Sequence, residues 1–210
     1  MNSYHFLVLK YKFQMSYPKV VLVGETNVGK TSLCERYRTS HFNTNSVPTI
    51  GAAKGLLNVK VDEETVTLDL WDTAGQERYR SLTPMYFSNC CVAIFVYDIV
   101  TELTFASLNS FYSLLKQKAP DSCNIVIVGN KCDLASDRKV DILDVEEYGN
   151  SINAKFCMET SAKTGAGVDE LFVRVAMIAK ESVSSNHNTN NNQSSPVAID
   201  QKETQKGKCC

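Results

Sequence analysis

Short apolar runs rich in β-branched residues recur along the chain and predict its strands. The run at residues 19–24 is continuous rather than alternating, which is typical of a strand buried on both faces. Residues 56–61 and 65–71 flank a polar segment at 62–64, so they predict a β-hairpin. Three further strands are predicted at residues 91–97, 125–129 and 155–159.

Apolar positions with three- and four-residue spacing lie between these runs and predict helices. Phe105, Leu108, Phe111 and Leu115 follow this spacing, and other helices are predicted at residues 30–37, 144–152 and 168–179. Because strands and helices alternate, the pattern favours an α/β fold with a mostly parallel sheet and helices on both faces. Ligands bind such sheets at the carboxyl ends of the strands.

The same pattern divides the chain into a domain and two ends. We expect residues 18–181 to form one domain. Residues 182–210 are rich in Asn, Ser, Thr and Gln and cannot bury enough apolar area to offset the entropy of ordering, so a disordered tail is expected. Residues 1–17 predict an N-terminal extension without a secretory signal, and whether Met1 or Met15 starts the native protein stays open.

Composition excludes several classes of function. The 210 residues carry a formal net charge of −1, so no general attraction to nucleic acid is expected. No run approaches the roughly 18 consecutive apolar residues that indicate a membrane-spanning helix. The cysteines ahead of the tail show no metal-ligand spacing, and we expect reduced thiols in the cytosol.

Residues 24–31 match the phosphate-loop pattern Gly-x-x-x-x-Gly-Lys-Ser/Thr between a predicted strand and a predicted helix. The N–H groups of such a loop and the positive end of the next helix bind polyphosphate. Lys30 would reach the β- and γ-phosphates, and the Thr31 hydroxyl would ligate Mg²⁺. Alone, the loop fits an ATPase, a GTPase or a nucleotide kinase. The candidate nucleotide-binding residues here are Gly24, Thr26, Asn27, Val28, Gly29, Lys30, Thr31 and Ser32.

Asp72, Gly75 and Gln76 follow the third predicted strand and suit a γ-phosphate sensor. Asp72 can hold Mg²⁺, directly or through water. Gly75 lacks a Cβ, so its N–H can approach the γ-phosphate, and Gln76 can orient the attacking water. Thr49 lies in a polar connection upstream, where its hydroxyl can complete the magnesium shell when a γ-phosphate is present.

Asn130, Lys131 and Asp133 follow the fifth predicted strand and indicate selection of guanine. The Asp133 carboxylate can accept hydrogen bonds from the ring N–H and the exocyclic amine of guanine. Adenine lacks both donors there and would leave the carboxylate buried and unpaired, which disfavours ATP. The Ser161-Ala162-Lys163 segment follows the sixth predicted strand and can present a backbone N–H to the guanine carbonyl.

These motifs together resemble those of the Ras superfamily, and its Rab branch in particular. The resemblance spans residues 19–180, is closest to the early-endosomal, Rab-five-like group, and is carried by residues 49–53, 71–79, 80–87, 97–99 and 158–163. It implies a P-loop NTPase G domain whose six-stranded, mostly parallel sheet has one antiparallel hairpin edge.

The resemblance also implies ligands and roles. The expected ligands are GTP, GDP and Mg²⁺, with Thr31, Thr49 and Asp72 at the metal. Gln76 and Lys30 are the expected catalytic residues of a slow GTPase that an activating protein accelerates by supplying an arginine. Phe42 is expected to pack against guanine, with Lys131 covering its other side.

Cys209 and Cys210 resemble the geranylgeranylated cysteine pair of Rab proteins. Two lipid chains give stable anchoring where one gives only reversible binding. The resemblance implies a monomeric G domain on the cytoplasmic face of intracellular membranes, in particular endosomes, with a chaperone-bound cytosolic pool. The implied partners are an exchange factor, an activating protein, a GDP-dissociation inhibitor, a Rab escort protein and tethering effectors that regulate vesicle fusion.

Two departures from the Rab pattern lie at the site. Lys54 replaces an aromatic residue that helps to form the effector-reading surface, which leaves the effectors open. Thr26 and Asn27 replace small residues beside the γ-phosphate, which leaves the hydrolysis rate open. The alternatives are a Rab of another compartment, a pseudo-GTPase acting as a membrane-recruited binding module, an ATP-using phosphotransferase, and a plasma-membrane GTPase of the Ras or Rho type.

Overall fold

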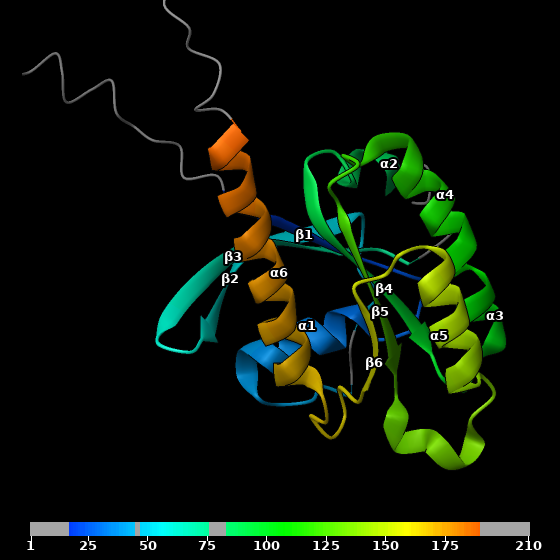
Figure 1. The fold of residues 1–210 in the computed structure, drawn as a ribbon. Helices are drawn as coiled ribbons and strands as arrows, with labels where there is room; N and C mark the ends of the chain where they lie inside the picture. Colours follow the sequence, from blue (N-terminus) through cyan, green and yellow to red (C-terminus); the bar gives the residue numbers. More distant parts are fainter. Residues whose placement is uncertain (1–16, 45–46, 76–82, 190–210) are drawn as a thin grey trace, which may run out of the picture.

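A computed structural model describes residues 17–44, 47–75 and 83–189 of the chain. Their strands form one six-stranded sheet in the order β2-β3-β1-β4-β5-β6 (Figure 1). The antiparallel pair is β2 (Ala52–Val61) with β3 (Glu64–Thr73), and the turn between them includes Asp62 in a left-handed conformation. From β3 onward the neighbouring strands pair in parallel: β3 is followed by β1 (Lys19–Val23), β4 (Cys90–Asp98), β5 (Asn124–Asn130) and β6 (Phe156–Thr160). The predicted α/β fold with one hairpin edge is therefore confirmed.

Helices cover both faces of the sheet. One face carries α1 (Lys30–Thr39) and α6 (Val168–Thr189), and the other carries α3 (Glu102–Ala106), α4 (Leu108–Lys118) and α5 (Ile142–Ser151) (Figure 1). Two short elements were not predicted from the sequence: α2 (Thr83–Tyr86) and a 3-10 helix, η2 (Cys132–Asp137).

Each face of the sheet has its own hydrophobic core, which explains the continuous apolar runs. Along β1, Val20 and Leu22 point toward α1 and α6, whereas Val21 and Val23 pack in the opposite core with α4 and α5. All four side chains are fully buried. Alternate side chains of a strand point to opposite faces, so a strand covered on both faces needs apolar residues at every position.

Two helix boundaries differ from the prediction. The single helix expected around residues 105–115 is two helices meeting at Ser107, whose hydroxyl donates to the Thr104 carbonyl at 2.8 Å and so competes with the helix backbone. The last helix runs to Thr189, beyond the domain end predicted at residue 181. Once a helix has formed, each added residue gains a hydrogen bond, which favours its extension. The Ser182 hydroxyl accepts from Asn124 Nδ2 at 3.0 Å and donates to the Ile178 carbonyl at 2.9 Å.

Within the described residues, every helix is too short or too polar to traverse a lipid bilayer.

The packing of α6 on α1 leads to a prediction of stability. Phe172 is fully buried, and its ring centroid lies 4.6 Å from that of Tyr37. Phe172→Ala is expected to lower the free energy of unfolding by about 3–5 kcal/mol, because it leaves a cavity in the core. Urea unfolding followed by fluorescence of Trp71, the single tryptophan, measures the change. Met177→Ala on the same helix is the control: its side chain is exposed, so a loss below about 1 kcal/mol is expected, and equal losses would contradict the assignment.

Candidate functional site

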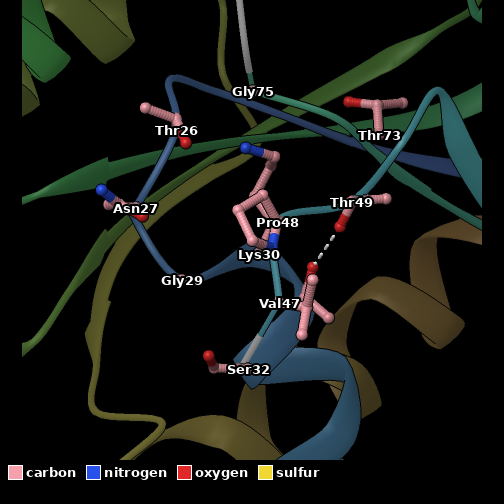
Figure 2. A pocket seen from close by; sticks show the side chains of 11 residues that line it. Thr26, Asn27, Gly29, Lys30, Ser32, Val47, Pro48, Thr49, Thr73 and Gly75 are labelled. Atoms are coloured by element: carbon pink, nitrogen blue, oxygen red, sulfur yellow. Dashed lines mark hydrogen bonds between the residues drawn. The ribbon is translucent and has the colours of Figure 1, made fainter. Parts of the chain in front are cut away.

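The sequence motifs meet at the carboxyl edge of the sheet, around two adjoining cavities. The smaller cavity, of about 70 Å³, is lined by the phosphate loop, by residues 47–49 and by Thr73 and Gly75 (Figure 2). The larger, of about 270 Å³, is lined by residues that include Phe42, Asn130, Lys131, Asp133, Ala162 and Lys163. Asn27, Gly29 and Ser32 line both cavities, so the two form one continuous site.

The phosphate loop has a conformation that requires glycine at two positions. Gly24 and Gly29 have φ angles of 151° and 97°, and Asn27 between them is also left-handed, at 62°. A Cβ on Gly24 would lie 2.1 Å from the Val96 carbonyl oxygen, and one on Gly29 would lie 2.2 Å from the Asn130 amide nitrogen. Left-handed residues in such a turn allow successive N–H groups to form a concave anion site.

Lys30 is buried under the loop. Its Nζ donates to the carbonyl oxygens of Gly24 and Glu25, both at 2.8 Å. Burial lowers its pKa to about 8, opposed by the nearby charge of Asp72. A phosphate group in the cavity would favour the ammonium form and relieve this cost.

Three oxygen-bearing side chains converge beside Lys30. The Thr31 hydroxyl donates to Asp72 Oδ2 at 2.6 Å. It also shares a hydrogen bond of 2.8 Å with the Thr49 hydroxyl, drawn as the dashed line that ends at Thr49 in Figure 2. Asp72 Oδ1 is buried with no hydrogen-bond partner among the described residues, and burial raises the pKa of this carboxyl. Hydroxyl and carboxylate oxygens with one unsatisfied atom fit Mg²⁺, which keeps several water and phosphate ligands and needs few from the protein.

The two segments expected to sense a γ-phosphate are joined to each other and to the loop. The Ala74 N–H donates to the Gly51 carbonyl at 2.7 Å, which links the end of β3 to the connection that carries Thr49. A Cβ on Gly75 would lie 2.4 Å from the backbone of Glu25 and Thr26. Glycine is therefore needed at residue 75 for contact with the loop itself, in addition to the predicted access of its N–H to phosphate.

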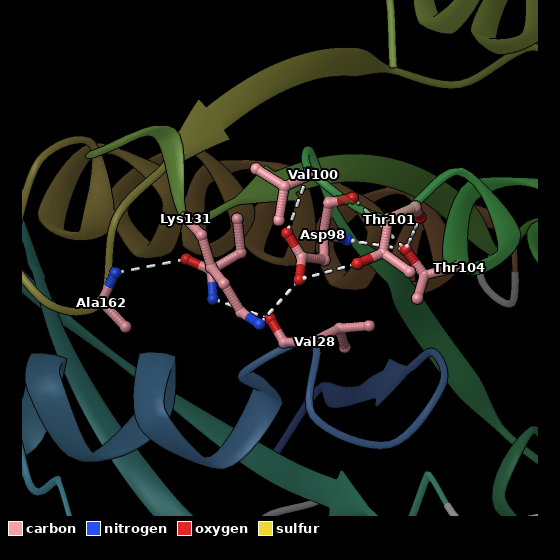
Figure 3. A network of polar contacts seen from close by, with 8 residues as sticks. Val28, Asp98, Val100, Thr101, Thr104, Lys131 and Ala162 are labelled. Carbon is pink, nitrogen blue, oxygen red and sulfur yellow. Dashed lines mark hydrogen bonds and ion pairs between the residues drawn. The ribbon is translucent and has the colours of Figure 1, made fainter. Parts of the chain in front are cut away.

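Asn130 connects the parts of the site. Its amide Nδ2 donates to the Val28 carbonyl at 2.8 Å, and its Oδ1 accepts from Thr160 Oγ1 at 3.3 Å and from the Ala162 N–H at 3.2 Å. Figure 3 shows Val28 and Ala162 on either side of this network. The predicted base-reading residue thus acts as a bridge between the phosphate loop, β5 and the segment after β6.

Asp133 is held in place at the larger cavity. Its Oδ1 accepts from the Ser161 hydroxyl at 2.6 Å, and its Oδ2 lies 3.8 Å from Lys163 Nζ. Ser161 is fully buried and does not line the cavity, so it reaches the site through Asp133. Phe42, 37% exposed, lines the same cavity as Lys131, and their packing against guanine stays a prediction.

Asp98 has a role in the site that was not predicted from the sequence. This buried residue ends β4 opposite Asn130, and its Oδ2 lies 2.7 Å from Lys131 Nζ (Figure 3). It also accepts from the Val100 N–H at 3.0 Å and from the Thr101 hydroxyl at 3.3 Å. The signal for this role was present in the sequence. Asp98 is an acidic residue at the end of an apolar strand, and that strand lies beside the one that precedes Lys131.

Three predicted site residues cannot be placed: Gln76, Cys209 and Cys210 lie outside the described residues. Thr26 and Asn27, the two residues that replace small residues of the Rab pattern, line the smaller cavity. The six cysteines in the described ranges are free, and no group of three His, Cys, Asp or Glu side chains there is placed to hold a metal.

Comparison with known proteins identifies the family. The model of the Ras family matches residues 19–181. Ras-related protein Rab-22A of Mus musculus is 44% identical over 158 residues, which cover 75% of this chain and 81% of the relative. The Homo sapiens Rab-22A is 43% identical over the same length and shares of each chain, and Homo sapiens Rab-31 is 43% identical over 154 residues, or 73% of this chain and 78% of the relative.

The chain therefore belongs to the Ras family. It is a Rab-type GTPase that binds GTP, GDP and Mg²⁺, hydrolyses GTP to GDP, and acts in vesicle traffic. The alternatives of a pseudo-GTPase and an ATP-using phosphotransferase are not favoured.

The ion pair of Asp98 with Lys131 leads to a prediction of nucleotide release. Asp98→Asn keeps an oxygen for the Val100 N–H but removes the charge that fixes Lys131 Nζ. Hydrogen bonds to charged groups contribute about 1.5–3 kcal/mol, so GDP is expected to dissociate about tenfold faster or more. Release of a fluorescent GDP analogue measures the rate. Glu170→Gln, which breaks the exposed pair with Arg174, is the control and should leave release unchanged; an unchanged rate in Asp98→Asn would remove Asp98 from this role.

Proposed function

We propose that this Rab-type GTPase works as a nucleotide-dependent switch in endosomal vesicle traffic, with the two adjoining cavities as its nucleotide site. The observation that carries the site assignment is the convergence of Lys30, Thr31, Thr49 and Asp72 beside a cavity that continues to Asp133. The phosphates occupy the smaller cavity, and the base occupies the larger one.

At the phosphate end, the loop N–H groups and Lys30 hold the β- and γ-phosphates. Thr31, Thr49 and Asp72 are placed to hold Mg²⁺, which neutralises charge on the phosphate oxygens when it is bound. Thr26, Asn27, Gly29 and Ser32 line this end, and Gly75, just after β3, meets it. Gly24 and Val28 belong to the same loop and complete the proposed set of nucleotide-binding residues.

At the base end, Asp133 accepts from the two N–H donors of guanine. Phe42 and Lys131 cover its faces, and the segment of Ala162 and Lys163 closes the rim. Specificity follows because adenine offers neither of the two donors, so the Asp133 carboxylate would keep only its contacts with Ser161 and Lys163.

Thr49 makes the site a switch. Its hydrogen bond to Thr31 attaches residues 47–51 to the metal end of the site, and the Ala74 to Gly51 bond attaches the end of β3. Loss of the γ-phosphate would weaken both attachments, so the two segments would respond together.

Hydrolysis depends on Gln76 to orient water and on an outside arginine. None of the described residues that line the smaller cavity is an arginine, which supports a slow intrinsic rate and a requirement for an activating protein. An exchange factor, a GDP-dissociation inhibitor, a Rab escort protein and tethering effectors complete the proposed partners of a monomeric G domain.

The first test of the function removes the water-orienting amide. Gln76→Leu is expected to lower single-turnover GTP hydrolysis by at least about tenfold, because the attacking water loses its orienting partner, while GDP affinity stays within about twofold. Phosphate release and fluorescent-GDP titration give the two values. Unchanged hydrolysis would exclude Gln76 from this role, and failure of the unmodified chain to bind GDP would exclude the proposed site.

The second test concerns the membrane and its compartment. Since one lipid chain gives only marginal binding, Cys210→Ser should shift much of the protein to the cytosol, and removal of both Cys209 and Cys210 should shift all of it. Cell fractionation and imaging of the tagged protein against endosomal markers measure this. GDP binding of the variants should be unchanged, and full membrane retention without either cysteine would contradict prenylation as the anchor.

A further inference from the structure

Arg36, in the last turn of α1, joins this helix to the segment that follows β6. Its Nε donates to the Ala162 carbonyl at 2.6 Å, and its Nη2 donates to the Lys163 carbonyl. Its Nη1 donates to the Ser40 carbonyl at 2.7 Å. One guanidinium group thus holds backbone carbonyls from two parts of the chain that are distant in sequence.

A basic side chain near the end of a helix can have a simpler role. It can satisfy the last carbonyl groups of the helix and interact favourably with the helix dipole. The bond from Arg36 to Ser40 fits this role, because Ser40 is the C-terminal cap of α1. The bonds to Ala162 and Lys163 do not fit it, since these residues lie 126 and 127 positions away in the connection between β6 and α6.

The bond to Ala162 fixes the direction of a peptide group at the larger cavity. In a trans peptide, the C=O of one residue and the N–H of the next point in opposite directions within one plane. The described peptide bonds are all trans. Arg36 holds the Ala162 carbonyl toward α1, so it also directs the Lys163 N–H away from α1, and Lys163 lines the larger cavity.

The bond to Lys163 connects Arg36 to the residue that reads the N–H donors of guanine. The Lys163 carbonyl shares a peptide group with the Thr164 N–H, which donates to the Ser161 hydroxyl at 3.1 Å. The Ser161 hydroxyl in turn donates to Asp133 Oδ1 at 2.6 Å. Hydrogen bonds in such a chain polarise and strengthen one another. Arg36 therefore supports the orientation of Asp133 through this chain.

The bond to Ser40 holds the start of the connection that carries Phe42. Ser40 is left-handed, with a φ angle of 60°, which is uncommon for a residue with a Cβ. Its N–H donates to the Arg36 carbonyl at 2.8 Å, and its own carbonyl accepts from the Arg36 side chain, so both of its backbone polar groups are bonded. Phe42 follows two residues later and lines the larger cavity. Arg36 thus holds two segments that border this cavity.

We propose that Arg36 is a positioning residue for the guanine base. It holds the Lys163 N–H in the direction of the carbonyl oxygen of guanine, and it holds the Phe42 segment at the same cavity. Arg36 thereby slows the release of guanine nucleotides and strengthens discrimination at that oxygen. The inference rests on the proposed function, because it requires the base to occupy the larger cavity.

Arginine suits this role better than lysine. Its planar guanidinium presents five N–H donors in a rigid fork, which can bind two neighbouring carbonyl groups at once. The ammonium group of lysine is a compact charge on a flexible stem, so it does not fix two carbonyl groups in one geometry.

The test compares GDP with 6-thio-GDP on the full chain. The analogue keeps both N–H donors for Asp133 but carries sulfur, a weak acceptor, in place of the carbonyl oxygen. Displacement of a ribose-labelled fluorescent GDP gives the two affinities, and its release into excess GDP gives the dissociation rate. We expect the wild type to prefer GDP several-fold. Arg36→Ala should release GDP about tenfold faster or more, and its preference for GDP should fall toward one.

Arg36→Lys separates the geometry of the fork from its charge. Lysine keeps the positive charge and a high helix propensity, so α1 and its dipole interaction should be maintained. GDP release should still be about threefold faster or more than in the wild type, with a reduced preference for GDP, because the two carbonyl groups are no longer held together. This variant decides the question if Arg36→Ala does not fold.

Arg38→Ala is the matched control, because Arg38 is an exposed basic residue in the same turn of α1. It removes an equal charge from the helix end and should leave the preference for GDP unchanged. Equal loss of this preference in Arg36→Ala and Arg38→Ala would overturn the proposal.

Three other outcomes would also overturn it. The first is equal weakening of GDP and 6-thio-GDP by the Arg36 variants, which would leave Arg36 with a role in stability alone. The second is wild-type release and preference in both Arg36 variants. The third is equal affinity of the wild type for the two nucleotides, because the segment after β6 would then not read the carbonyl oxygen.

Competition between GDP and ADP is measured on the same preparations. If the wild-type chain fails to bind GDP, or binds ADP equally well, the proposed function fails. If the wild-type chain binds GDP selectively and the results expected for the Arg36 variants are not obtained, only the inference about Arg36 fails.

Discussion

The side-chain amide of Asn130 is the constraint on which the site depends. One side chain, through donor and acceptor atoms, fixes the phosphate loop at Val28, the end of β6 at Thr160, and the following segment at Ala162. Val28 is distant in sequence from Thr160 and Ala162, and the Asn130 amide joins it to the paired ends of β5 and β6, where Asn130 lies opposite Thr160. Because all of the bonds are buried, loss of the amide would leave several polar groups unsatisfied at once.

The same site contains two buried charged groups that a bound ligand would stabilise. Lys30 and Asp72 are both buried. Burial lowers the pKa of Lys30 and raises the pKa of Asp72, so it favours the neutral form of each group. Neither group is relieved fully by the other, since Lys30 donates to backbone carbonyls and one oxygen of Asp72 has no partner in the described part of the protein. A polyphosphate supplies negative charge beside Lys30, and a divalent cation supplies positive charge beside Asp72. These two buried groups therefore favour ligand binding more than they stabilise the fold.

Much of the fold could be predicted from the sequence, because strands buried on both faces produce apolar runs that few other structures produce. The residues from Gly24 to Thr31 could be predicted because a loop that binds phosphate through its backbone needs glycine at fixed positions. The residues from Asn130 to Asp133 could be predicted because their side chains must lie at fixed spacing after a strand. The role of Asp98 could not be found this way: its partner Lys131 is distant in sequence, and pairing of β4 with β5 brings them together. The extension of α6 was missed for a different reason, because residues with poor burial potential can still continue a helix whose first turns are packed.

The position of Asp98 has a consequence beyond the base itself. Its carboxylate accepts from Lys131, Val100 and Thr101, while its backbone N–H donates to the Thr104 hydroxyl at 3.0 Å in the first turns of α3. The start of α3 and the platform under the base are therefore parts of one hydrogen-bonded unit. When the base leaves, the start of α3, on the face of the sheet opposite α1, would become less stable. Nucleotide binding would therefore affect a part of the surface that is remote from both phosphate-sensing segments.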